Sequence, residues 1–265
     1  MHWLLPLLAA AVLAACGGDS TTAGTFSPAP GNPGPAGASP VLGVAATYGV
    51  FASSAAVNLA ANSSVTGDVG LNPAGACTGC AVGVTVLGGG VIHNGDQAAI
   101  DAQAAFGAAY VDAANRSTNA CTIVDGELAN AQAACAGVTN GPIYAPGLYR
   151  TASPIGVGAT FTITLDAGGN PDAVFIFQTN SAITTGTDSR VVLAGGAQAK
   201  NVWWMAGSAA TLGERSIFKG TVIANGAAVQ VLVGTALAPT LVEGRLFSSS
   251  AGVGLDSFAR VTVPQ

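Results

Sequence analysis

The sequence predicts a mainly β fold in which short strands stack as the coils of a β-solenoid, with one α-helix. Two observations carry this prediction. The composition is poor in charge, with 8% charged residues and 37 Gly among 265 residues. An apolar cluster followed by an alternating strand recurs about every 20 to 30 residues, a period typical of solenoids. Its anchors are Phe51, Phe177, Trp204, Ile223 and Phe247. A β-sandwich is the alternative fold, and the shared register of the repeats favours the solenoid.

The N-terminal segment is predicted to be an export signal. Residues 1–15 hold an apolar run that is too short to span a bilayer, and Cys16 follows it. The run Leu13-Ala14-Ala15-Cys16 resembles a bacterial lipobox. We therefore expect a lipoprotein signal peptide over 1–15 and a lipid anchor on Cys16; a signal peptide cut elsewhere is the alternative. Gly17-Gly18 favours the outer membrane or cell surface as the location.

Residues 16–40 are predicted to be a semi-extended tether rich in Gly, Pro, Ser, Thr and Ala. Repeated prolines there block both helix and sheet. The folded domain is expected over residues 41–265, which is long enough to form one sizeable core. We expect this domain to be monomeric and to reach a membrane only through the lipid anchor.

One segment has the pattern of a helix, from about residue 97 to 115. Asp96 is the expected N-cap, and the segment is rich in Ala, a strong helix former. An apolar stripe is expected through Ala99 and Phe106, with Ile100 and Val111 beside it.

Two strands offer this helix a partner. Residues 174–177 and 202–205 are continuously apolar, so both sides of each strand should be buried. The other strands alternate, which leaves one side in water. We therefore expect the helix to lie along the face formed by the two continuous strands, with Trp203 and Trp204 both buried.

Several segments resemble, in order, the microbial ice-binding protein family of the DUF3494 type. They are Leu42–Tyr48, Val65–Pro73, the Ala-rich helix, Pro146–Tyr149, Leu165–Gln178 and Asn201–Trp204. The resemblance implies a right-handed, discontinuous β-solenoid of triangular section with the helix alongside. It also implies that the N-terminal coil lies beside the C-terminal coil. The implied function is ice binding, as an antifreeze, an inhibitor of ice recrystallisation or an ice adhesin.

The ice-contacting residues must be argued from the surface, because the resemblance gives no shared motif for them. Ice is a flat, neutral and regular lattice, so its partner should be flat, uncharged and covered with small side chains. Thr is suited because its χ1 is stiff, and strands lie about 4.7–4.9 Å apart, near a lattice repeat. The predicted outward file is Asn58, Thr184, Thr211, Gln230 and Gly254, with Gly156 on the same face. A second file lies two residues earlier: Ala56, Ala182, Ala209, Ala228 and Gly252.

A second candidate surface is the strand that carries Thr160, Thr162 and Thr164, although no matching Thr strands extend it. The alternative function is a cell-surface adhesin or structural β-helix module without ice activity. A glycan-binding adhesin would expose aromatic side chains for sugar stacking.

The remaining chemistry is sparse. The acids lie mainly at turns, whereas polysaccharide-cleaving enzymes need paired carboxylates or metal-bound acids, so we expect no enzyme activity and no cofactor. Eight Lys and Arg residues with a net charge of −5 disfavour nucleic acid as a partner. A zinc site lacks a second ligand pair, because only His93 is available, so no metal is expected.

Four cysteines follow Cys16, and an oxidising compartment favours disulfides between them. The preferred pairings are Cys77 with Cys80 and Cys121 with Cys135. The alternative links Cys80 to one of the later cysteines.

Overall fold

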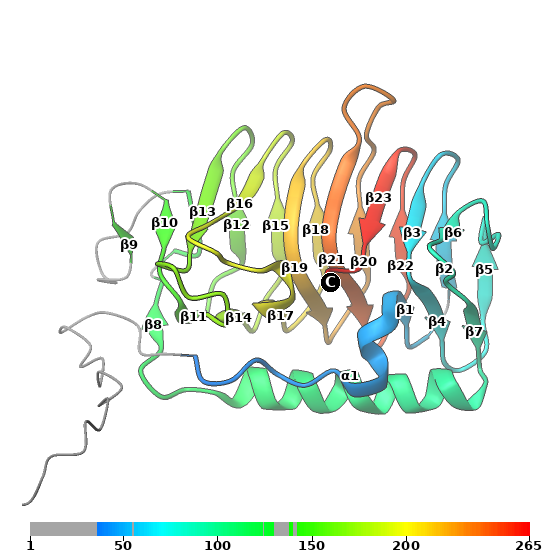
Figure 1. The fold of residues 1–265 in the computed structure, drawn as a ribbon, viewed down its shortest axis with the longest axis horizontal. Helices are drawn as coiled ribbons and strands as arrows, with labels where there is room; N and C mark the ends of the chain where they lie inside the picture. Colours follow the sequence, from blue (N-terminus) through cyan, green and yellow to red (C-terminus); the bar gives the residue numbers. More distant parts are fainter. Residues whose placement is uncertain (1–35, 55, 124, 130–137, 140–141) are drawn as a thin grey trace, which may run out of the picture.

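The computed structural model describes residues 36–54, 56–123, 125–129, 138–139 and 142–265 (Figure 1). The predicted signal peptide, Cys16, most of the tether and Cys135 lie outside these residues. The described part is mainly β, with parallel strands stacked along one axis and a single long helix beside them, as predicted.

Each complete coil gives one strand to each of three faces. The first face is a seven-stranded sheet in the order β12-β15-β18-β20-β22-β2-β5. Its strands are β12 (Ile155–Val157), β15 (Ile183–Thr185), β18 (Ala210–Leu212), β20 (Val229–Val231), β22 (Val253–Leu255), β2 (Ala56–Leu59) and β5 (Ala76–Thr78).

The second face lies under the helix and is called the helix face. Its strands are β8 (Cys121–Thr122), β11 (Gly147–Thr151), β14 (Phe175–Thr179), β17 (Val202–Ala206), β1 (Tyr48–Ala52), β4 (Asp68–Leu71) and β7 (Ile92–Asn94). The third face holds β9 (Val138–Thr139), β10 (Ile143–Tyr144), β13 (Thr162–Asp166), β16 (Arg190–Ala194), β23 (Ala259–Thr262), β3 (Ser64–Thr66) and β6 (Val86–Leu87). Short 3-10 helices, η1 (Gly43–Thr47) and η2 (Ala199–Asn201), precede β1 and β17.

Two long strands, β19 (Ile217–Ala224) and β21 (Thr240–Ser248), run from the third face onto the helix face. The chain turns this corner at Gly220, whose φ is +113°. A Cβ added there would lie 2.7 Å from the carbonyl oxygen of Val202. Only glycine fits this turn without strain.

The N-terminal coil stacks on the C-terminal coil. Strand β1 pairs with β21, β2 with β22 and β3 with β23. The chain then reaches β7 at one end of the stack, and the helix carries it along the solenoid to β8 at the other end (Figure 1). This is the discontinuous order that the family resemblance implies.

The helix α1 (Gln97–Asn115) has the predicted bounds, and the Asp96 side chain accepts a hydrogen bond from the Ala99 amide at 2.8 Å. Its buried residues are Ala99, Ala102, Phe106, Ala109 and Ala113. The expectation for the neighbouring stripe was wrong, because Ile100 and Val111 are 44% and 57% exposed. Alanines at spacings of three and four form the contact, since they let the helix approach the strands closely.

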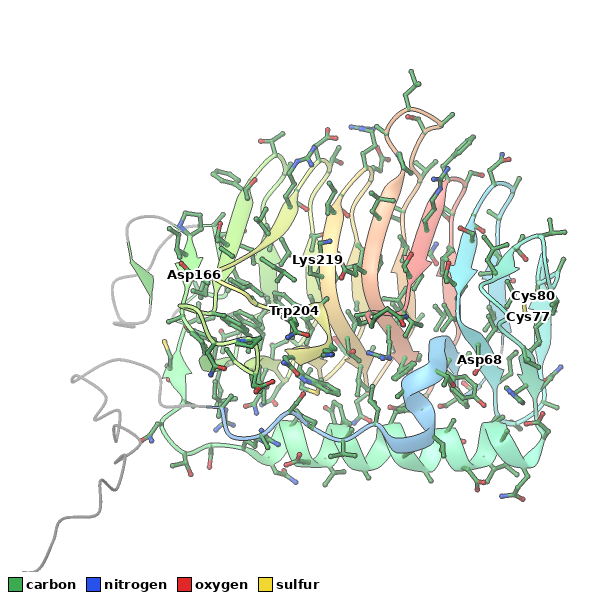
Figure 2. All side chains as sticks on the ribbon, viewed as in Figure 1. Asp68, Cys77, Cys80, Asp166, Trp204 and Lys219 are labelled. Carbon is green, nitrogen blue, oxygen red and sulfur yellow. A yellow bond between two sulfur atoms is a disulfide. The ribbon has the colours of Figure 1, made fainter. Side chains whose placement is uncertain are left out.

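Hydrophobic side chains form two clusters. Inside the coils, the ring of Phe177 stacks between those of Tyr149 and Trp204, at centroid distances of 5.0 and 4.2 Å. Between the helix face and α1, Phe106 lies among apolar residues that include Trp203. Trp204 (labelled in Figure 2) belongs to the cluster inside the coils and Trp203 to the cluster under the helix, so they point to opposite sides of β17, and both are buried, as predicted.

The last residues before position 41 pack against the solenoid. Ala36 and Leu42 are buried beside the helix. The Arg116 guanidinium donates through Nη1 to the carbonyl oxygens of Ala36 and Ala38, at 2.5 and 2.7 Å. The Trp203 indole N–H donates to the Ser39 hydroxyl at 3.0 Å. The last residues of the predicted tether therefore contact α1 and β17.

A disulfide joins Cys77 and Cys80 at the β5 end of the solenoid, with Cα atoms 5.5 Å apart (Figure 2). The predicted pairing of Cys121 with Cys135 involves a residue outside the described part and stays a prediction. Within the described residues, no helix is long and apolar enough to cross a membrane.

Candidate functional site

The seven-stranded sheet brings the first predicted file into a single row. In register, Gly156 lies beside Thr184, Thr184 beside Thr211, and Thr211 beside Gln230. The row continues through Gly254 and Asn58 and ends at Thr78. The sequence analysis missed Thr78. The inward-facing residue of its strand is Cys77, so the strand lacks the alternation of aliphatic and polar residues that marked the other strands.

The row faces outward because its neighbours along each strand face the core. Ile183, Leu212 and Val253 are all buried. Alternating side chains of a strand point to opposite sides, so burying these residues fixes the outward direction of Thr184, Thr211 and Gly254.

The second predicted file also stacks from coil to coil. The carbonyl oxygens of Ala182, Ala209 and Ala228 each accept a hydrogen bond from the adjacent coil, at 2.9 to 3.1 Å. These alanines immediately precede their strands and form a margin of small side chains along the row. Ala56 and Gly252 continue this margin, and a Cβ on Gly252 would lie 2.6 Å from the Ala56 carbonyl oxygen.

Glycines form the opposite margin, which the sequence did not reveal. Gly158, Gly186 and Gly213 follow the row by two residues on successive coils. A Cβ on Gly186 would lie 2.4 Å from the Ala159 amide nitrogen, and one on Gly213 would lie 2.4 Å from the Gly186 carbonyl carbon. The coils therefore touch through backbone here, which keeps this edge low and flat.

The row is flat at its Thr end and uneven at the other. The Gln230 amide donates to Asp256 at 2.9 Å. It also lies across Gly254, since a Cβ there would meet Gln230 Oε1 at 2.1 Å. A shallow hollow of about 360 Å³ opens beside it, lined in part by Asn58 and Thr78. The level part of the surface is thus centred on Thr184 and Thr211.

Charged groups lie at the margins of this sheet. Arg215 pairs with Asp188 at 2.8 Å and with Glu214 at 3.4 Å, at the corner with the third face. The hydrogen bond from Arg215 holds the pKa of Asp188 below its usual value. Glu127 forms a parallel bridge with Gly156, so it lies in register at the end of the row, and its carboxylate accepts from the Gly158 amide at 3.1 Å. The outward row itself, from Gly156 to Thr78, carries no charge.

On the adjacent strand β16, neither Thr162 nor Thr164 is paired with a Thr. Thr162 lies beside Arg190, and Thr164 beside Val192. Thr160 lies outside β13, with a φ of +66°. The same face carries an ion pair between Lys219 and Glu243, at 2.5 Å (Figure 2). This face is therefore charged and does not form an extended Thr array.

The part of the chain that the structure describes offers little support for a metal site or for a site of acid–base catalysis. It holds no cluster of three or more His, Cys, Asp or Glu side chains that could bind a metal ion. His93 Nδ1 lies 2.9 Å from Asp96 Oδ2, so this histidine supports the cap of α1.

Comparisons with known proteins agree with the geometry. A family model described as ice-binding-like matches residues 50–261. Ice-binding protein K1-A of Typhula ishikariensis is 32% identical over 200 residues, covering 69% of this chain and 76% of that protein. The ice-binding protein of Flavobacterium frigoris (strain PS1) is 29% identical over 237 residues, covering 84% and 76% respectively.

Solved structures give the same result. The crystal structure of an ice-binding protein from an Antarctic biological consortium matches with a TM-score of 0.72 at 30% identity. The match covers 86% of this chain and 92% of that chain. The family resemblance seen in the sequence is therefore confirmed, and the chain belongs to the ice-binding-like protein family.

Proposed function

We propose that this protein binds ice through its seven-stranded sheet, with Thr184 and Thr211 at the centre of the contact. The observation that carries the proposal is the uncharged row in strict register, bordered by Ala on one side and Gly on the other. Family membership supports ice as the partner.

The size and spacing of this sheet suit a lattice. Seven strands at about 4.7–4.9 Å extend roughly 29 Å along the solenoid. Small side chains on a rigid backbone hold surface water in a regular arrangement, because the row from Gly156 to Thr78 itself contains no charged side chain that would reorient the water. Each Thr fixes a methyl and a hydroxyl together through its restricted χ1. Bound molecules force ice to grow between them with a curved front, which slows growth and recrystallisation.

Matched Thr→Tyr substitutions on two faces test the proposal. Thr184→Tyr and Thr211→Tyr each raise a ring above the level part of the sheet, so ice shaping and adsorption of a fluorescent copy should be lost. Thr164→Tyr places the same ring on the charged third face and should leave both activities intact. Melting curves check that all three variants fold. Loss of activity only in Thr164→Tyr would assign ice binding to the Thr160, Thr162 and Thr164 strand instead.

The proposed function is binding of ice only, without enzymatic catalysis. Several described acids have structural roles; for example, Asp96 caps the helix and Asp188 pairs with Arg215. The rival function, a glycan-binding adhesin without ice activity, has weaker support, because Trp203 and Trp204 are buried. A glycan array beside an ice-affinity pulldown separates the two functions.

We also propose that the protein is exported and held at the outer membrane or cell surface by a lipid on Cys16. The lipobox-like run before Cys16 supports this. The described N-terminal segment runs beside α1, so it leaves the seven-stranded sheet uncovered (Figure 1). Mass spectrometry of the native protein should find an acylated Cys16 at the N-terminus; a free N-terminus at another residue would remove the anchor. We expect a monomer, which sedimentation analysis tests.

A further inference from the structure

A buried arginine without an acidic partner lies on the far side of the molecule from the proposed ice surface. Arg245, on β21, is 6% exposed. Its Nε donates to the Ala46 carbonyl oxygen of η1 at 2.9 Å. Within the described residues, its two Nη groups have no hydrogen-bond partner and no carboxylate lies within ion-pair distance.

This arrangement is costly for the protein alone. A buried charge is normally paired and hydrogen-bonded, because removing it from water is unfavourable. Burial lowers the pKa of Arg245 to about 10, and no acid offsets the effect. In register beside it on β19, Thr221 has a buried hydroxyl that also lacks a partner in the described structure. The Thr221 hydroxyl is thus buried and unsatisfied, and the Arg245 Nη groups have no protein partner among the described residues.

Arg245 lines a pocket of about 420 Å³ at the corner between the helix face and the third face. Gly67, Gly88 and Gly89 form part of its wall, and all three have positive φ. The amides of Gly88 and Gly89 donate no hydrogen bond to any described residue. The pocket wall therefore brings a guanidinium together with an exposed glycine turn, and both guanidinium groups and the backbone amides of such turns bind oxyanions.

Asp68, which also lines this pocket, limits the charge of the ligand (Figure 2). Its carboxylate accepts from the Val91 amide at 2.9 Å and so is held in place. A fixed negative charge repels a doubly charged anion more strongly than a singly charged one. A planar carboxylate also matches the fork of a guanidinium, with two parallel N–H···O bonds.

We propose that this pocket binds a small carboxylate anion, with Arg245 as its main ligand. This site is independent of the ice surface, since it is built from the two other faces of the solenoid. Its occupation would supply the missing partner of Arg245 and stabilise the corner where η1, β3, β4 and β21 meet.

Titration of the wild-type protein with sodium acetate tests this proposal directly. In ¹H–¹⁵N spectra of arginine side chains, the Arg245 Nε–H resonance should shift and saturate, while sodium chloride at equal ionic strength should not reproduce the shift. The melting temperature should rise with acetate in parallel. An unchanged Arg245 resonance, or an equal shift with chloride, would overturn the proposal.

Variants locate the site. Arg245→Met keeps the length of the side chain and should lose the acetate-dependent rise, whereas Arg245→Lys should keep part of it. Arg260→Met, which removes an exposed arginine of β23, should behave as the wild type.

Sodium sulfate stabilises proteins generally, so its effect is measured as the difference between wild type and Arg245→Met. A larger Arg245-dependent effect of sulfate than of acetate would contradict the preference for a single charge. Ice shaping should be unchanged by acetate or by Arg245→Met. A failure of the carboxylate-site proposal can therefore be distinguished from a failure of the ice-binding proposal.

Discussion

Lengthening the Thr row should strengthen ice binding. Thr184, Thr211, Gln230 and Gly254 occupy four consecutive strands in register. The double variant Gln230→Thr with Gly254→Thr would extend the row from two threonines to four. At about 4.8 Å per strand, the row grows from roughly 5 to roughly 14 Å.

The cost to stability should be small, and it can be worked out from the contacts. Replacing Gln230 removes its hydrogen bond to Asp256, which is partly exposed, at a cost of about 1 kcal/mol. It also removes the side-chain oxygen that a Cβ at Gly254 would meet at 2.1 Å. Thr is preferred over Gly in strands by up to about 1 kcal/mol. The free energy of unfolding should therefore change by less than about 1 kcal/mol, a few degrees in Tm.

The assay is thermal hysteresis and recrystallisation inhibition at equal protein concentration. The double variant should exceed Gln230→Thr alone, and that variant should exceed the wild type, because each step adds one Thr to the level part of the sheet. Gly254→Thr alone should gain less, because the Gln230 amide is pushed out of its position. If the double variant folds and melts as expected but shows no gain, the reasoning that an ordered Thr row sets the ice contact is refuted.

Two further predictions concern the fold. Phe106→Ala should lower the free energy of unfolding by about 3–5 kcal/mol in urea denaturation, because the ring is 1% exposed and lies 5.0 and 4.9 Å from those of Phe51 and Phe247; a loss below 1 kcal/mol would contradict the role of this contact in holding α1. Asp188 has a folded-state pKa below its usual 3.8 because Arg215 donates to it, so its stabilisation is present at neutral pH and is lost as the pH falls through the folded value. The melting temperatures of wild type and Asp188→Asn should therefore converge on acidification, and a constant difference between them would contradict this assignment.

Local patterns predicted much of the molecule. The helix bounds followed from Asp96 and an Ala-rich run, which act within a few residues of each other. The outward direction of Thr184 and Thr211 followed from alternation, because buried Ile183 and Leu212 fix the pleat of their strands.

Errors arose where a neighbour decided the outcome. Ile100 was expected at the margin of the buried stripe, but close packing of α1 through its alanines turned it to solvent. The structure also places Arg190 beside Thr162, a neighbour that the sequence of the Thr strand does not show. No pattern within one strand reveals what lies on the next.

The sequence by itself determined which side chains point inward or outward and where the helix begins and ends, since these depend on residues adjacent in the chain. Only the tertiary structure decided which strands lie side by side. It set Asn58 next to Gly254, brought the glycine margin of Gly186 and Gly213 together, and buried Arg245 at a corner where none of the described carboxylates forms an ion pair with it. These relations join coils far apart in the chain, and they depend on how the whole stack closes on itself.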